Sequence, residues 1–256
     1  MKKIMKRISI LLLLGYVAMG LFLYVYQRDF LYFPTPDIAT PYTEMVLQNE
    51  GESLKIIMLN KGHRNAILYF GGNAESMAQS SEYIAQQFPN FTVYLMNYRG
   101  YGGSTGVSSE KGLYSDALKL YDTIKPKHNR ISIGGRSLGS GIAVYVAANR
   151  EVSKLALITP FDSIVNVAQE MYPLYPVSFL LDDHYDSLSR IKKIRAKTFI
   201  VTAQHDKVIT RERTQELINA FDPAQLKVKM IKNRGHMDIS SDAKYYKIMQ
   251  EFIGEG

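Results

Sequence analysis

Residues 131–141 read ISIGGRSLGSG, a short apolar run followed by a glycine-rich turn that leads into an apolar helix. This is the pattern G-x-S-x-G in the context of a strand, a sharp turn and a helix, and it predicts that Ser137 is a nucleophile at the turn. The flanking glycines avoid the clashes that the strained turn would impose on larger residues. A phosphate-binding turn is the alternative, but the spacing of a Walker A sequence is missing from this stretch.

The chain on either side of this turn alternates between strand and helix patterns. Short alternating runs at Thr43–Leu47 and Ser53–Leu59 flank the turn signal Asn49-Glu50-Gly51 and predict a leading hairpin. Apolar runs typical of strands covered on both faces follow at Ala66–Phe70, Phe91–Met96, Ile131–Ile133, Leu155–Ile158, Thr198–Thr202 and Leu226–Ile231. Helical periodicity lies between them at Glu75–Phe88, Glu110–Ile124, Leu138–Ala148, Arg211–Phe221 and Ala243–Ile253. The pattern predicts an α/β fold, with a leading antiparallel hairpin, a mostly parallel sheet and helices on both faces.

Two further residues with catalytic chemistry follow later strands. Ligands bind outside the carboxyl ends of parallel strands, and Asp206 and His236 each follow one of the last two expected strands. The order Ser137, Asp206, His236 predicts a triad in which His236 takes the serine proton and Asp206 holds the imidazole in the correct tautomer. Asp162 also follows a strand and is the rival acid, although the later strand is the commoner site.

Hydrolysis also requires donors aimed at the oxyanion of the tetrahedral intermediate. The backbone N–H of Leu138, next to the nucleophile, is one candidate. The N–H of Asn73, in the loop Gly71-Gly72-Asn73-Ala74 after the strand Ala66–Phe70, is the other. An ordinary glycine turn leading into the next helix is the alternative interpretation of that loop.

From about Thr43 to its end the chain resembles the α/β-hydrolase superfamily. The stretches GGNAE (71–75) and NYRGYGGS (97–104), together with an N-terminal apolar helix followed by QR (27–28) and LYFP (31–34), are similar to its membrane-associated lysophospholipase and protein-depalmitoylase branch. That branch usually has histidine where this chain has Gly71, so the geometry of the loop departs from the family pattern there. The resemblance implies an α/β-hydrolase fold and a hydrolase without a cofactor.

The N-terminus has the pattern of a membrane anchor. Four basic residues within Met1–Arg7 precede the uncharged run Ile8–Tyr26, which is close to the roughly 20 helical residues that cross a bilayer. The positive-inside rule predicts a cytoplasmic N-terminus and a catalytic domain on the outer (periplasmic, extracellular or lumenal) side of the membrane. A signal peptide cleaved near Ala18-Met19-Gly20 is the alternative. We expect an anchor at 1–27, a proline-containing linker at 28–42 and a hydrolase domain at 43–256.

Composition excludes several other classes of protein. The 256-residue chain has a formal charge of +7, but its basic residues are scattered rather than gathered as in a nucleic-acid binder. It has no cysteine for a disulfide, a thiolate metal site or a cysteine nucleophile. The cluster Asp182-Asp183-His184-Tyr185-Asp186 is too tightly spaced to give usable metal geometry. No metal or cofactor is implied, and the oligomeric state is not indicated.

The segment Met171–Arg190 interrupts the alternation of strands and helices. Its aromatic residues and prolines predict a short lid that shapes an apolar acyl pocket over Ser137, or else aromatics that only pack on the core. We therefore expect a membrane-anchored serine hydrolase of carboxylic esters or thioesters, acting on lipid or acylated substrates. A peptidase, with Glu75 or Asp182 binding the substrate amine, and a non-catalytic membrane-tethered binding module are the alternatives.

Overall fold

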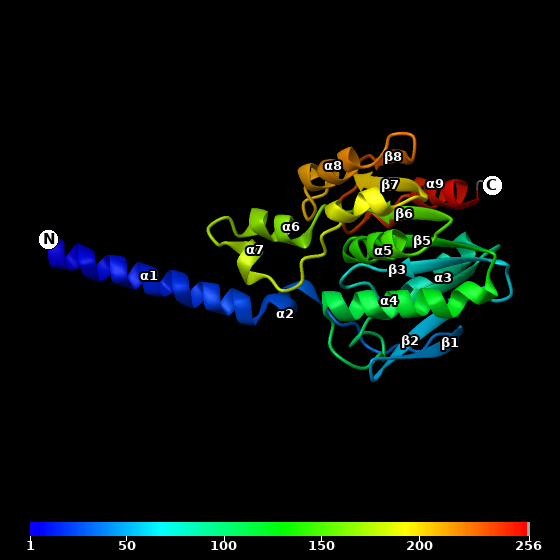
Figure 1. The fold of residues 1–256 in the computed structure, drawn as a ribbon, viewed down its shortest axis with the longest axis horizontal. Helices are drawn as coiled ribbons and strands as arrows, with labels where there is room; N and C mark the ends of the chain where they lie inside the picture. Colours follow the sequence, from blue (N-terminus) through cyan, green and yellow to red (C-terminus); the bar gives the residue numbers. More distant parts are fainter. Residues whose placement is uncertain (255–256) are drawn as a thin grey trace.

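The computed structural model describes residues 1–254, whose strands form one eight-stranded sheet (Figure 1). In chain order these strands are β1 (Thr43–Asn49), β2 (Glu52–Leu59), β3 (Asn65–Phe70), β4 (Thr92–Met96), β5 (Arg130–Arg136), β6 (Lys154–Ile158), β7 (Lys197–Ala203) and β8 (Leu226–Ile231). Their spatial order is β1-β2-β4-β3-β5-β6-β7-β8. The strand β2 runs antiparallel to β1 and β4, and the remaining neighbours are parallel. The predicted hairpin and mostly parallel sheet are confirmed.

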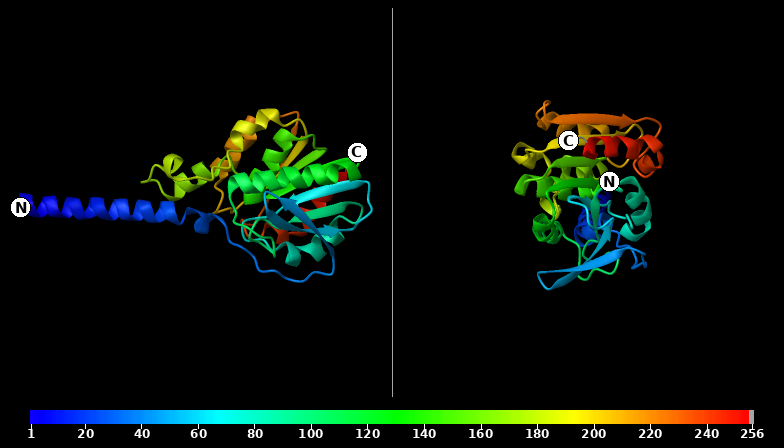
Figure 2. Two further views of the ribbon diagram at one scale, coloured as in Figure 1. Left: turned by 60° about the horizontal axis from the view of Figure 1, so that its bottom comes forward. Right: turned by 90° about the vertical axis from the view of Figure 1, so that its right-hand side faces the viewer.

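Helices cover both faces of the sheet, as Figure 2 shows. The α-helices are α1 (Lys2–Val25), α2 (Gln27–Leu31), α3 (Met77–Gln87), α4 (Glu110–Ile124), α5 (Leu138–Asn149), α6 (Ile164–Met171), α7 (Val177–Leu180), α8 (Arg211–Ala220) and α9 (Ala243–Gly254). Short 3-10 helices lie at Lys125–Lys127, Leu188–Lys193 and Ile239–Ser241. Apolar residues of α4, α5 and α8 pack on one face of the sheet, and those of α3 and α9 pack on the other. Successive strand residues point to opposite faces, so one sheet supplies both halves of the core.

The first turn of the expected helix Glu75–Phe88 is replaced by a loop. The helix α3 begins at Met77, and the side chain of Ser76 caps it by accepting a hydrogen bond from the Gln79 N–H. The carboxylate of Glu75 turns back instead and accepts a hydrogen bond from the N–H of Gly72 at 3.0 Å. This local bond competes with helix formation, so Glu75 stays in the loop after β3 and is not part of α3.

The helix α1 projects from the body of the protein (Figures 1 and 2). It is long and apolar enough to cross a membrane, and it contains no buried residue. The stretch 28–42, expected to be a linker, begins with specific contacts instead. Tyr32 is buried and bonds the Tyr185 hydroxyl at 2.9 Å, while Arg28 forms an ion pair with Asp183 at 3.1 Å. The chain after α1 is therefore fixed against the body.

The two interpretations of the segment 171–190 each hold for different residues. Tyr172 and Tyr175 line a cavity above Ser137, whereas Tyr185 is fully buried in the main core. Phe179 does neither, since 88% of it is exposed. The segment thus lines the cavity with Tyr172 and Tyr175, is held in the core by Tyr185, and exposes Phe179 at its tip.

A buried ion pair ties the leading hairpin to the rest of the fold. Arg99, in the loop after β4, bonds both oxygens of Asp116 on α4 at 2.7 and 2.8 Å. Asp116 is fully buried, and its Oδ1 also accepts a hydrogen bond from Asn49 at 2.7 Å. Arg99 reaches Glu50, in the β1–β2 turn, at 2.8 Å. Three segments distant in sequence therefore meet at one carboxylate.

We predict that Asp116→Ala lowers the free energy of unfolding by about 3–5 kcal/mol, because it leaves the Arg99 guanidinium without its main partner in a buried site. Asp122→Ala is the matched control, because Asp122 on the same helix pairs with Arg150 in the same two-bond geometry at 2.7 and 2.8 Å. Half of the Asp122 side chain is exposed, so its loss should cost about 0–1 kcal/mol. Urea unfolding in detergent, followed by circular dichroism, measures both. An equal loss of unfolding free energy in the two variants would contradict the stabilising role of the buried Arg99–Asp116 pair.

Candidate active site

Ser137 lies at the sharp turn between β5 and α5, with φ 49° and ψ −119°. A positive φ is strained for a residue with a side chain and costs about 1–3 kcal/mol unless its surroundings hold it. Here its N–H donates to the Ile158 carbonyl at 2.9 Å, and its carbonyl accepts from the Ser140 hydroxyl at 2.6 Å. The turn expected from G-x-S-x-G is present, and it is clamped on both sides.

Two glycines of the motif allow α5 to start almost against the sheet. A Cβ on Gly139 would lie 2.1 Å from the Phe70 carbonyl oxygen, and one on Gly135 would lie 2.4 Å from the Gly139 carbonyl oxygen. Real Cβ atoms are not found this close to backbone oxygens, so neither position tolerates a side chain without a shift of the helix. Close packing, rather than positive φ, explains these two glycines.

His236 and Asp206 form a hydrogen-bonded row with Ser137. The register of β7 and β8 pairs Ala203 with Ile231, so the loops that carry the two residues leave the sheet side by side. His236 Nε2 lies 2.8 Å from Ser137 Oγ, and His236 Nδ1 lies 2.8 Å from Asp206 Oδ2. With the Nδ1 proton donated to the carboxylate, Nε2 is free to accept the serine proton.

The second oxygen of the Asp206 carboxylate is also held. Its Oδ1 accepts hydrogen bonds from the backbone N–H groups of Val208 and Ile209 at 2.9 and 2.8 Å. This arrangement fixes the plane of the carboxylate while Oδ2 faces the imidazole. The ring of His236 is in turn almost fully buried, with 7% exposed, so the row is shielded from water.

Asp162, the rival acid, lies elsewhere in the hydrogen-bond network. Its Oδ2 pairs with Arg213 at 2.9 Å and accepts from Asn166 at 2.7 Å. Its Oδ1 accepts the N–H of Ser163, the residue that caps α6. These partners satisfy Asp162 without any bond to the imidazole.

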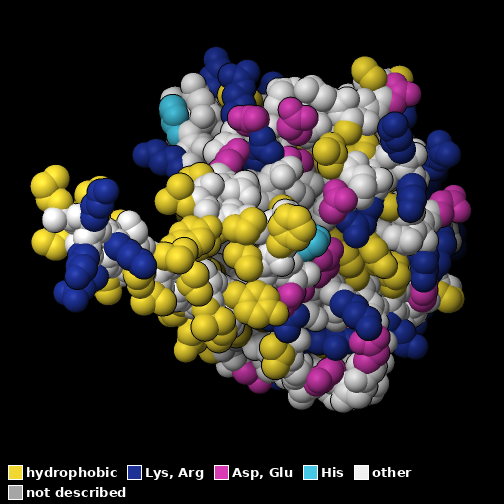
Figure 3. All heavy atoms as spheres, turned by 60° about the vertical axis from the view of Figure 1, so that its left-hand side comes forward, with side chains coloured by type: hydrophobic (Ala, Val, Ile, Leu, Met, Phe, Trp, Pro, Cys, Tyr) yellow, Lys and Arg dark blue, Asp and Glu magenta, His cyan; other side chains and the backbone are white. Residues whose placement is uncertain are grey.

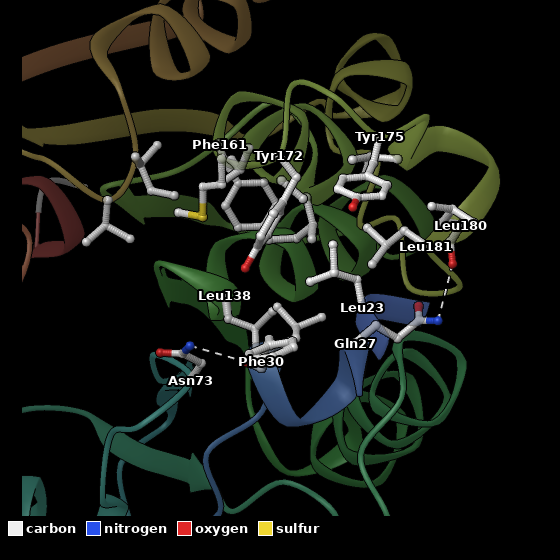
Figure 4. Close-up of a pocket in the computed structure, with 18 of the residues that line it drawn as sticks. Leu23, Gln27, Phe30, Asn73, Leu138, Phe161, Tyr172, Tyr175, Leu180 and Leu181 are labelled. Atoms are coloured by element: carbon white, nitrogen blue, oxygen red, sulfur yellow. Dashed lines mark hydrogen bonds between the residues drawn. The ribbon is translucent and has the colours of Figure 1, made fainter. Parts of the chain in front are cut away.

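The loop after β3 reaches the nucleophile, because Phe70 at the end of β3 pairs with Gly135 on β5. A Cβ built on Gly72 would lie 3.8 Å from the Ser137 Cβ. Asn73 and Leu138, the two expected oxyanion donors, both line the cavity that contains Ser137 (Figure 4). Neither backbone N–H donates to another group among residues 1–254, so both are available to a bound oxyanion.

Gly71, which stands where the similar branch usually has histidine, lies beside the side chains of Met77 and Glu75. A Cβ at this position would lie 2.4 Å from the terminal methyl of Met77 and 3.3 Å from Glu75. Its carbonyl accepts a hydrogen bond from the Tyr98 hydroxyl at 2.7 Å. The loop is therefore fastened through its backbone at this position, and the nearest contacts of such a Cβ are with side chains that can shift.

Sequence reasoning missed a bridge that links the loops around the nucleophile. Glu75, which bonds the Gly72 N–H, also faces Arg136 at 3.5 Å, and Arg136 donates to the His236 carbonyl at 3.1 Å. Burial works against the charge of Arg136, but the facing Glu75 carboxylate and neighbouring phenols hold its pKa above the usual value. The bridge joins the loop after β3, the turn at Ser137 and the loop that carries His236. An arginine directly before the serine was its one signal in the sequence.

The cavity beside Ser137 has a volume of about 360 Å³ and an apolar lining (Figure 4). Its wall comes from five parts of the chain: the end of α1 with α2, the loop after β3, the turn at Ser137, the segment around α6 and α7, and the loop after β7. Phe30, Phe161 and Tyr172 point into it, and the residues that line it include no Asp, Glu, Lys or Arg. Glu75 and Asp182, the expected binders of a peptide amine, are not part of this wall. An uncharged acyl group suits such a surface.

No protein-family model matches the chain, but similarity to known proteins extends over most of its length. Rv2307c, an uncharacterized protein of Mycobacterium tuberculosis, is 28% identical over 84% of this chain and 83% of that protein. Protein bem46 of Schizosaccharomyces pombe is 25% identical over 93% of this chain and 89% of its own. The α/β hydrolase domain-containing protein 17B of Xenopus laevis is 29% identical over 74% of this chain and 66% of its own length.

Solved structures share the fold at low sequence identity. An esterase of Pyrococcus furiosus has a TM-score of 0.68 at 14% identity, over 87% of this chain and 98% of its own. The enol-lactonase of Burkholderia xenovorans has a TM-score of 0.65 at 16% identity, over 82% of this chain and 100% of the enol-lactonase chain. These likenesses show that the chain has the α/β-hydrolase fold.

Proposed function

We propose that the chain is a serine hydrolase that cleaves carboxylic ester or thioester bonds through an acyl intermediate on Ser137. The observation that carries the proposal is the hydrogen-bonded row in which His236 lies 2.8 Å from Ser137 on one side and 2.8 Å from Asp206 on the other. A nucleophile, a base and an orienting acid in this order match the requirements of acyl transfer. Similarity to α/β hydrolase domain-containing proteins supports the same class.

In the first half of the proposed reaction, Ser137 Oγ attacks the substrate carbonyl as His236 Nε2 takes the hydroxyl proton. Asp206 stabilises the imidazolium that forms. The N–H groups of Asn73 and Leu138 bind the oxyanion. When the carbonyl re-forms, the alcohol or thiol leaves with the proton from His236. In the second half, His236 deprotonates a water that attacks the acyl carbon, which releases the acid and restores Ser137.

The apolar cavity supports substrates that are lipid-derived or acylated. It contains Ser137 and is lined by uncharged side chains, so it can hold an alkyl chain next to the nucleophile. The peptidase alternative has less support, because Glu75 is occupied by Arg136 and Gly72 outside the cavity wall. The binding-module alternative gives no reason for the hydrogen-bonded row of Ser137, His236 and Asp206.

The proposal includes an uncleaved membrane anchor formed by α1. Cleavage after Gly20 would remove Tyr16, whose ring stacks on Tyr175 of the cavity wall with centroids 4.6 Å apart. A leader that is discarded has no reason to pack against a side chain of the cavity wall. The basic residues before Ile8 then favour a cytoplasmic N-terminus, with the catalytic domain on the outer side of the membrane.

We predict that Ser137→Ala abolishes both fluorophosphonate labelling and ester turnover, because the nucleophilic oxygen is removed. Ser140→Ala is the control, since Ser140 lies one turn along the same helix and bonds only the Ser137 carbonyl. It should still be labelled. Labelling of the Ser137→Ala protein at the wild-type level would remove Ser137 as the nucleophile.

We predict that Asp206→Asn lowers kcat for ester hydrolysis by about 10⁴-fold, because an amide no longer selects the reactive tautomer of His236. Asp162→Asn should leave kcat of the folded protein close to the wild-type value, since Asp162 bonds Arg213 and Asn166 instead. Steady-state kinetics on one ester substrate compares the two. The reverse ranking would assign the acid to Asp162.

We predict that the C-terminus lies outside the cytoplasm, so that alkaline phosphatase fused after Gly256 is active and green fluorescent protein fused there is dark. Alkaline phosphatase, which needs an oxidising compartment, and green fluorescent protein, which fluoresces in the cytoplasm, give opposite signals in such fusions. A fluorescent and phosphatase-negative fusion would overturn the proposed orientation while leaving the catalytic assignment untouched.

A further inference from the structure

The tip of the lid, residues 171–181, packs against the middle of α1. The rings of Tyr16 and Tyr175 stack with 4° between their planes. The Tyr16 hydroxyl donates to the Leu174 carbonyl at 2.7 Å, and the Tyr175 hydroxyl donates to the Tyr16 carbonyl at 3.2 Å. Tyr16 lies near the centre of the uncharged run of α1. The lid tip therefore lies alongside the part of α1 that the proposed anchor would place inside the bilayer.

The uncharged stretches of α1 and of the lid tip end at the same level. Residues 171–181 contain no charged side chain and lie between Glu170 and Asp182. The Asp182 N–H donates to Gln27 Oε1 at 2.6 Å, and Gln27 Nε2 donates to the Leu180 carbonyl at 3.2 Å. Gln27 directly follows the uncharged run Ile8–Tyr26 and precedes Arg28, where charged residues resume. Two segments distant in sequence thus share one boundary between apolar and charged residues.

The outer surface of the lid tip is apolar and uncovered. Leu174 is 78% exposed, Phe179 88% and Met171 55%. Figure 3 shows hydrophobic side chains gathered where α1 meets the body, with the basic residues of α1 at its far end. The Tyr16 and Tyr175 hydroxyls are paired with each other's segments, so they need no water. Pairing of these two hydroxyls and exposure of apolar side chains both favour contact with hydrocarbon.

We propose that the lid tip is a second membrane-embedded element, which enters the bilayer beside α1 and opens the acyl cavity directly into the hydrocarbon. The occupant of the exposed apolar surface is the lipid bilayer. This inference rests on the proposed function and deepens it: Leu23 of α1 and Tyr175 of the lid both line the cavity that holds Ser137. An acyl chain in the bilayer then enters the cavity laterally, between α1 and the lid tip, and reaches Ser137 without passing through water.

Tryptophan fluorescence tests the depth of the lid tip, because the natural chain contains no tryptophan. The full-length protein is reconstituted into phosphatidylcholine vesicles whose acyl chains carry bromine, which quenches tryptophan on contact. Phe179→Trp should lose emission as strongly as Leu11→Trp in α1, and its spectrum should shift to the blue. Val46→Trp, at an exposed position on β1, is the control that should keep its emission.

Quenching of Leu11→Trp with no quenching of Phe179→Trp would place the lid tip in water and overturn the inference. Absence of quenching at both positions would overturn it together with the anchor. This measurement needs no catalysis, so its result is separate from the fluorophosphonate labelling that tests Ser137.

Turnover provides a second test. A carboxylate at hydrocarbon depth shifts an insertion equilibrium by roughly a hundredfold. Phe179→Asp should therefore reduce turnover of a long-chain ester held in vesicles by at least about tenfold. Hydrolysis of a short, water-soluble ester should remain unchanged, because Phe179 does not line the cavity. Val46→Asp should affect neither substrate. No loss, or an equal loss on both substrates, would overturn the inference.

Discussion

The distance between α5 and the ends of β3 and β5 is the constraint on which the active site depends. Gly139 lies so close to the sheet that a Cβ there would overlap the carbonyl oxygens of Phe70 and Gly71, at 2.1 and 2.5 Å. Because α5 starts this near, Leu138 and Asn73 of the loop after β3 line the same cavity beside Ser137. A bulkier residue would move the helix outward and separate the two proposed oxyanion donors. The glycines therefore set the geometry on which the proposed acyl transfer depends.

That close approach creates strain, and the surrounding loops hold it in place. Ser137 has a positive φ, which a residue with a side chain adopts only where its neighbours enforce it. Its backbone bonds to Ile158 and Ser140 provide the inner clamp. The Glu75–Arg136 bridge is the outer one, because it fastens the loop after β3 and the carbonyl of His236 to the same guanidinium. Strain at the nucleophile is thus balanced by hydrogen bonds that also position its partners.

The parts of the molecule that follow from local pattern were predictable from the sequence. Strand and helix periodicity gave the order of the elements, and the rule that chemistry collects at strand ends selected Ser137, Asp206 and His236, which the structure joins by hydrogen bonds. Their catalytic roles remain a proposal. The Glu75–Arg136 bridge and the Arg99–Asp116 pair were not predictable, because each joins residues on different loops or helices. Pairing of that kind depends on tertiary packing and leaves no period in the sequence.

The same limit explains why the stretch after α1 reads as a plain linker, although it determines how α1 is attached. Asp183 is buried, and its carboxylate accepts from Arg28, from the Tyr32 hydroxyl and from the Glu110 N–H at the start of α4. Burial and this carboxylate raise the pKa of Tyr32, so its phenol stays protonated as a donor. These bonds lie just beyond Gln27, where charged residues resume. One polar junction therefore fixes α1 against the body at the level where its apolar run ends. Because the end of α1 also forms part of the cavity wall, the contacts that orient the helix shape the pocket as well.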